Sequence, residues 1–114
     1  MTRLSPGQRE AFEALRRDYL DGVPARIGAI RQALGEVGRR GAALEELLHR
    51  VHQLVGSSAI FGLGRVSAAA RAVEEHASGL PPGESRVEEL GRLVAALEAA
   101  WRESAPPPHR ASQD

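Results

Sequence analysis

Cysteine and lysine are both missing from this chain of 114 residues. Without cysteine, the chain has no disulfide scaffold, no thiol nucleophile and no thiolate ligand for zinc or an iron–sulfur cluster. All fifteen cations are arginine and fifteen carboxylates balance them, so no net charge favours nucleic acid or an anionic membrane. The sequence also lacks an apolar run of about 18–20 residues that would span a bilayer, and residues 1–6 show no secretory signal. We expect a monomeric cytoplasmic protein that binds neither nucleic acid nor membrane.

Aromatic residues are scarce, whereas good helix formers are abundant. The aromatic side chains are Phe12, Tyr19, Phe61 and Trp101, while alanine fills nineteen positions. The length suits one domain with one core. Composition therefore predicts a single all-α domain whose core consists of Leu, Val, Ile and Ala side chains.

Local signals in the first third of the chain predict two helices. Ser5 and Gln8 form a capping-box pattern with Pro6 at the first helical position, so a helix should begin there and continue to about Leu20. Residues 21–24, Asp-Gly-Val-Pro, interrupt the pattern, because proline restricts the residue before it. A second helix is expected to follow, with an apolar stripe at Ile27, Ile30, Leu34 and Val37, and to end at the glycines of residues 38–41.

Three more helices are expected downstream. One opens near Ala42, and we place its end at the glycines of residues 62–64 rather than at Gly56, because two glycines interrupt a helix more than one. The next covers residues 65–77. The last follows a second capping box at Ser85 and Glu88, and its apolar stripe is Val87, Leu90, Val94, Leu97 and Trp101.

Short connections between helices predict antiparallel neighbours. We therefore expect residues 1–104 to form an antiparallel up-down four-helix bundle with an additional N-terminal helix. Residues 105–114 are proline-rich and polar, with nothing to bury, and are predicted to be a disordered tail.

The sequence lacks the motifs of most catalytic sites. No phosphate-binding loop or dinucleotide fingerprint is present, so the chain should not use ATP by itself, and the Ser57–Ser58 pair has no credible oxyanion site. Glu46 and His49 form a Glu-x-x-His pair, but a di-iron bundle needs a second such pair and two further glutamates. We therefore interpret His49 and His52 as solvated histidines and predict neither a metal site nor a cofactor. His76 and His109 are expected on the surface.

The segment 52–62 breaks several local rules together. His52 is expected at the edge of the buried stripe of its helix, and Gly56 lies one turn further along the same outer face. A glycine there weakens the helix but removes every side-chain atom that would crowd the imidazole. Two interpretations stay open: Gly56 exposes a functional histidine, or it lets another helix approach closely.

This segment resembles the signature of the histidine-containing phosphotransfer (Hpt) domain. The matching positions are His52, Leu54, Gly56, Ser57, Ser58, Phe61 and Gly62, followed by Val66, Ala70, Val73 and Glu74 in the next helix. The resemblance implies that His52 is a solvent-exposed phosphoryl acceptor, with Gly56 and Ser57 supporting the site. It also implies as partners a response-regulator receiver domain, which would bring its own magnesium ion, a hybrid sensor histidine kinase, or both. The function implied is that of a phosphohistidine carrier in a multistep phosphorelay, not of an enzyme.

One position departs from the signature. The family usually has lysine three residues after the histidine, and this chain has Val55. A cation there would attract the phosphoryl group and an acidic receiver face. Arg65 and Arg71 are possible substitutes. The alternative function is therefore a docking module that binds a receiver or kinase without phosphoryl transfer.

Overall fold

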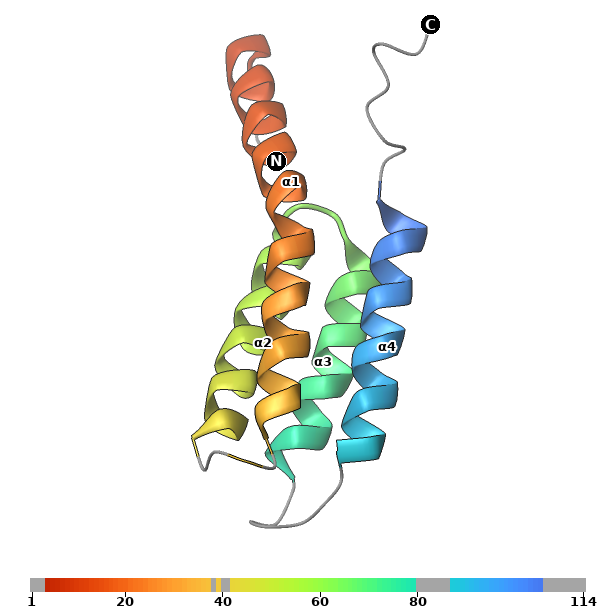
Figure 1. Cartoon of the computed structure of the whole chain (residues 1–114). Helices are drawn as coiled ribbons and strands as arrows, with labels where there is room; N and C mark the ends of the chain where they lie inside the picture. Colours follow the sequence, from red (N-terminus) through yellow and green to blue (C-terminus); the bar gives the residue numbers. More distant parts are fainter. Residues whose placement is uncertain (1–3, 38, 40–41, 80–86, 106–114) are drawn as a thin grey trace, which may run out of the picture.

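Four helices make up the fold. The structure, a computed structural model, describes residues 4–37, 39, 42–79 and 87–105. The helices are α1 (Pro6–Glu36), α2 (Ala43–Ile60), α3 (Gly64–Ser78) and α4 (Val87–Ser104). Each helix packs against the next one in the chain, and α4 returns to contact α1, so the four form an up-down bundle (Figure 1). The predicted all-α bundle is confirmed.

The additional N-terminal helix was a wrong prediction, because α1 runs without interruption through Pro24. A proline inside a helix costs about 3 kcal/mol. Val23 and Ile27 on either side of it are both buried, and burying each such side chain contributes about 1.5–3 kcal/mol. Pro24 itself is exposed. Packing against the bundle therefore outweighs the local signal, and one long helix replaces the two expected.

The N-terminal turns of α1 extend beyond the other helices (Figure 1). The helix begins at the predicted capping box, in which the Gln8 amide donates to Ser5 Oγ at 3.1 Å and the Ser5 amide donates to Gln8 Oε1 at 2.8 Å. Of the apolar residues Ala11, Phe12, Leu15 and Tyr19 in this part, only Tyr19 is buried, and Leu15 is 58% exposed. Phe12 is half-buried because its ring stacks on Phe61, 5.5 Å between centroids.

The core lies between the four helices and is aliphatic apart from one tyrosine. Its largest fully buried side chains are Ile30, Leu47, Leu54, Leu90, Leu97, Val23, Val51, Val66, Val73 and Val94. Trp101 packs against this core while staying half-buried, whereas Val87, expected in the stripe of α4, is exposed. The predicted stripe of the last helix therefore faces inward except at Val87.

The connection between α2 and α3 begins at Phe61 and confirms the predicted turn. Gly62 has φ = +80°, a left-handed conformation that glycine adopts without the steric cost of a side chain. Its amide donates to the Ala59 carbonyl, and the Leu63 amide donates to the Ser58 carbonyl at 2.8 Å. The segment around Gly56 stays helical, so α2 carries His52 on an unbroken helix.

Some predictions concern residues outside the described part of the chain. These are the glycines at 38 and 41, the capping residue Ser85 and residues 106–114 of the expected tail. Within the described helices, none is long and apolar enough to cross a membrane.

Candidate functional site

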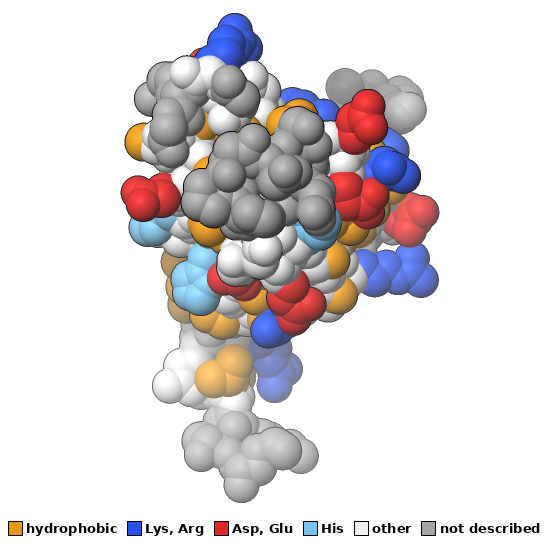
Figure 2. All heavy atoms as spheres, turned by 90° about the horizontal axis from the view of Figure 1, so that it is seen from below, with side chains coloured by type: hydrophobic (Ala, Val, Ile, Leu, Met, Phe, Trp, Pro, Cys, Tyr) orange, Lys and Arg blue, Asp and Glu red, His pale blue; other side chains and the backbone are white. Residues whose placement is uncertain are grey.

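His52 lies midway along α2 with 73% of its side chain exposed. The preceding residue, Val51, is fully buried, and a rotation of about 100° per residue brings His52 to the edge of that buried stripe. Viewed from the end of the bundle where α2 begins, histidine side chains lie at the surface beside carboxylates (Figure 2). The exposure expected of His52 is therefore seen in the structure.

A carboxylate from the neighbouring helix contacts this imidazole. Nδ1 of His52 lies 2.6 Å from Oε2 of Glu74, which α3 presents across the α2–α3 seam. The Glu74 side chain is only 24% exposed, so this contact is partly shielded from water. Short contacts between a ring nitrogen and a carboxylate are charge-assisted hydrogen bonds and orient the ring.

The contact also assigns chemistry to the two ring nitrogens. An ionised carboxylate only accepts hydrogen bonds, so Nδ1 of His52 is the donor and carries the proton. In the neutral ring, the lone pair then resides on Nε2. Among the described residues, Glu74 is the only hydrogen-bond partner of the ring, so Nε2 has no partner among them.

Gly56 lies one turn beyond His52 and is exposed. A Cβ atom built at this position meets nothing within 4 Å in the described structure. The interpretation that Gly56 admits a closely packed helix of the bundle is therefore wrong. The glycine instead leaves the surface beside the imidazole low and open.

Ser57 is directed toward α1 and not toward the imidazole. Its hydroxyl donates to the Gln53 carbonyl at 2.9 Å and accepts a hydrogen bond from the Tyr19 hydroxyl, with 2.6 Å between the oxygens. The adjacent Ser58 is fully buried and donates to the Leu54 carbonyl of its own helix. Of the two serine hydroxyls, only that of Ser57 links α2 to another helix.

Val55 faces the core. Only 7% of the residue is exposed, and its carbonyl accepts a hydrogen bond from the buried hydroxyl of Ser67 on α3 at 2.9 Å. The position at which the family usually has lysine is therefore occupied by a packed apolar side chain. No positive charge comes to the site from it.

The two arginines suggested as substitutes are placed on α3. Arg65 forms an ion pair with Glu103 of α4, with 3.1 Å between Nη1 and Oε1, so its guanidinium is directed to the α3–α4 side. Arg71 lies three residues before Glu74 on α3 and is exposed. No hydrogen bond or ion pair joins it to another residue that the structure describes.

The structure also bears on the other histidines and on the possibility of a metal site. His49 is exposed, and Glu46 approaches Arg50 at 3.4 Å. No group of three or more His, Asp or Glu side chains within the described ranges could hold a metal ion. His76 is half-buried, contrary to prediction, and its Nε2 has no hydrogen-bond partner among the residues described. His109 lies outside them.

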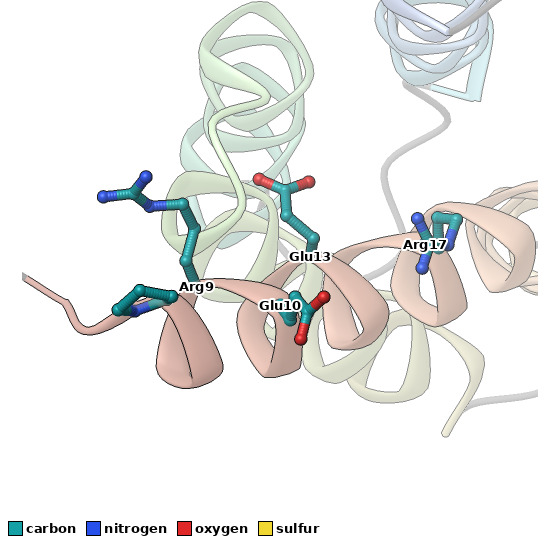
Figure 3. A pocket seen from close by; sticks show the side chains of 5 residues that line it. Arg9, Glu10, Glu13 and Arg17 are labelled. Carbon is teal, nitrogen blue, oxygen red and sulfur yellow. The ribbon is translucent and has the colours of Figure 1, made fainter.

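A surface hollow occurs along the N-terminal turns of α1. Its lining comes from that one helix, from Pro6, Arg9, Glu10, Glu13 and Arg17 (Figure 3). Two arginines and two glutamates give it charges of both signs. Since this part of α1 extends beyond the other helices, the hollow is not part of the His52 site (Figure 1).

A partly exposed ion pair links α1 to α4. Arg31 donates two hydrogen bonds to the Glu98 carboxylate, at 2.7 and 3.1 Å. These bonds lower the pKa of Glu98 and raise the pKa of Arg31, in each case against a smaller opposing effect of desolvation. The pair closes the bundle opposite the α2–α3 seam, so its role is structural.

Sequence reasoning predicted the exposure of His52 but not its contact with Glu74. The signal was present, because Glu74 matches the acidic position of the second helix in the family pattern. Its meaning depends on how α2 and α3 pack, which local spacing does not determine. Likewise, the contact of Ser57 with Tyr19 joins residues 38 positions apart.

Comparison with known proteins gives a family but no relative. No curated protein and no solved structure matches the chain significantly. The family model described as "Hpt domain" matches residues 14–100, most of the chain and all but the first turns of α1 and the last turn of α4. Domains of this family are histidine phosphotransfer intermediates of phosphorelays, not kinases. On this match, and with the four-helix bundle and the exposed histidine of α2 described above, the chain belongs to the Hpt domain family.

Proposed function

We propose that His52 is the phosphoryl acceptor of this Hpt domain and that the protein is a carrier in a multistep phosphorelay. It would receive the phosphoryl group from a receiver-domain aspartate and pass it to another receiver. The observation that carries the proposal is the contact of His52 Nδ1 with Glu74, which leaves Nε2 of an exposed imidazole as the nucleophile.

The transfer balances without any further reactant. The Nε2 lone pair attacks the phosphorus of the aspartyl phosphate, the bond from phosphorus to the aspartate oxygen breaks, and the aspartate leaves as a carboxylate. The Nδ1 proton stays in place, so the phosphorylated ring gains a positive charge. Glu74 at 2.6 Å stabilises that charge. The reverse sequence returns the phosphoryl group to a receiver.

The surroundings of His52 support access by a folded partner. Gly56 adds no side chain to the exposed face, and α2 is unbroken on both sides of the histidine. In-line attack requires close approach of the two reacting groups. A low, rigid surface beside the imidazole satisfies that requirement.

The direct test uses a receiver domain labelled on its aspartate. Incubation with this protein should transfer the label to histidine, giving an acid-labile, alkali-stable phosphoprotein. The His52→Gln variant should stay unlabelled, while His49→Gln, one turn away on the same helix, should label normally. Label persisting in His52→Gln would falsify the assignment of the acceptor.

A second candidate function rests on Val55, whose buried side chain supplies no cation next to the histidine. A docking module that binds a receiver or kinase without transfer would form a measurable complex but no phosphohistidine. Its binding would be unchanged in His52→Ala. The two functions therefore differ in the labelling experiment and not in the binding experiment.

A further inference from the structure

Two arginines line a groove between α1 and α2. Its lining is Arg26 of α1 with Arg50, Gln53 and Leu54 of α2, and we call it the Arg26–Arg50 groove. Leu54 is buried, so the groove has an apolar floor and two guanidinium groups at its rim. At about 100° per residue, Gln53 lies about 100° around α2 from His52 and Arg50 about 160°, so the groove is on the α1 flank of α2 and the imidazole is on the α3 flank.

Arg26 is held in the groove without a neutralising carboxylate. Its guanidinium carbon lies 5.2 Å from the centre of the Tyr19 ring, a cation–π arrangement that leaves the positive charge in place. Tyr19 is in turn fixed by its hydroxyl contact with Ser57, a residue of the Hpt signature. Arg26 forms no ion pair within 4.0 Å with any residue in the described part of the chain. The signature serine thus positions, through Tyr19, a cation from another helix.

Arg50 adds a second charge that is only weakly engaged. Its contact with Glu46, one turn earlier on α2, is 3.4 Å long, and both side chains are exposed by about 40% or more. Such exposed pairs at i and i+4 are screened by water and contribute little to stability. An incoming carboxylate or phosphoryl group can therefore compete for the Arg50 guanidinium.

We propose that the Arg26–Arg50 groove binds the acidic rim around the phosphoaspartate of the partner receiver, and that these arginines replace the lysine absent at position 55. The inference rests on the proposed function, because it takes His52 as the acceptor. The two flanks of α2 then have different roles. Glu74 on the α3 side orients the imidazole, and the arginines on the α1 side attract the negatively charged partner.

Charge complementarity identifies this occupant. A receiver site that holds a phosphoaspartate and a divalent cation is rich in carboxylates, and like-signed surfaces would repel it. Val55 supplies no charge, and Arg65 is paired with Glu103 on the α3–α4 side. Arg71 contributes a single exposed cation on the α3 side. The Arg26–Arg50 groove brings two guanidinium groups together on the α1 side, and its lining includes Gln53, the residue that follows His52.

The test compares two ways of phosphorylating His52. The receiver that labels the protein must dock, whereas phosphoramidate, a small phosphoryl donor, needs only an exposed imidazole. In Arg26→Gln/Arg50→Gln, we expect receiver-driven labelling at sub-saturating receiver to fall about three- to tenfold and the Kd for that receiver to rise equally. Labelling by phosphoramidate should stay within twofold of wild type. Within the double variant, Arg26→Lys in place of Arg26→Gln should restore part of the lost affinity, because the charge is kept.

Arg92→Gln is the matched control, since Arg92 is an exposed arginine of α4 with a carboxylate partner one turn away. It removes a charge but not the groove. Equal loss of receiver affinity in Arg92→Gln, or unchanged affinity in the double variant, would overturn the inference. Failure of phosphoramidate to label His52 would instead count against the proposed function. The binding measurement decides the role of the groove in either case.

Discussion

Nδ1 of His52 and Oε2 of Glu74 lie 2.6 Å apart across the seam of α2 and α3, although the two residues are 22 positions apart in sequence. The pair determines which ring nitrogen is available. On the proposed function, it also places a negative charge next to the ring that becomes positive when phosphorylated. The first prediction follows from it.

Replacing Glu74 by Gln should slow phosphoryl transfer to His52 by about tenfold to a hundredfold, the usual effect of losing a group that orients a functional histidine. Gln can still contact the ring but carries no charge to stabilise the phosphorylated imidazole. The measurement is the single-turnover rate from a labelled receiver at saturation. Glu75→Gln, which alters the exposed neighbour, is the control, and equal rates in both variants would contradict the role of Glu74.

Substitutions at Gly56 should separate folding from docking. Because a Cβ there meets no described atom within 4 Å, Gly56→Ala should raise the free energy of unfolding by about 0.5–1 kcal/mol through higher helix propensity. Gly56→Leu should keep the helix content yet weaken receiver binding, because the larger side chain stands beside the imidazole. Urea unfolding, circular dichroism and binding titration measure these effects. A loss of helix content in Gly56→Leu would contradict the open surface.

Val55→Lys should destabilise the bundle by about 1–3 kcal/mol, because a packed side chain that is 7% exposed is exchanged for one that must reach water. Gln53→Lys introduces the same charge at an exposed neighbouring position and should leave stability unchanged within about 0.5 kcal/mol. Urea unfolding of the two variants gives the comparison. Equal stability would show that position 55 admits a cation without repacking the core.

The Arg31–Glu98 pair should make stability depend on pH. The lowered pKa of Glu98 means that the pair stabilises the fold above the ordinary value of 4.5, and this contribution is lost as pH falls through the lowered value. Since Arg31 is 45% exposed, water screens the pair, and we expect Glu98→Gln to cost no more than about 1 kcal/mol at pH 7. Thermal unfolding between pH 7 and 3 should show the two proteins converging at acid pH. A gap that stays constant with pH would exclude this ion pair as its source.

Local signals predicted the parts of the fold that local energies decide. The capping box at Ser5 and the turn at Gly62 depend on hydrogen bonds and dihedral angles within a few residues, and both were found where expected. The continuity of α1 was missed because the cost of Pro24 is local, whereas the burial that outweighs it comes from other helices. Sequence spacing shows the local cost of the proline, but it does not show the burial against other helices that outweighs this cost.

In the candidate site, too, features determined by a single helix were predicted and contacts between helices were not. His52 was found because its own helix determines its exposure, and Gly56 was placed beside it for the same reason. Glu74 and the position of Arg26 over Tyr19 depend on contacts between helices far apart in the chain. Sequence spacing on one helix cannot show which residue of a neighbouring helix lies opposite.

The unbroken course of α2 through His52 has a thermodynamic consequence. An acceptor mounted on a continuous helix, with its ring held by Glu74, is already in its reactive arrangement before any partner arrives. On the proposed function, the ring needs no rearrangement to gain or to surrender the phosphoryl group, and the stability of the phosphorylated histidine cancels in the net transfer between two aspartates. In such a relay, the direction of flow is set by the relative free energies of hydrolysis of the two partners' aspartyl phosphates.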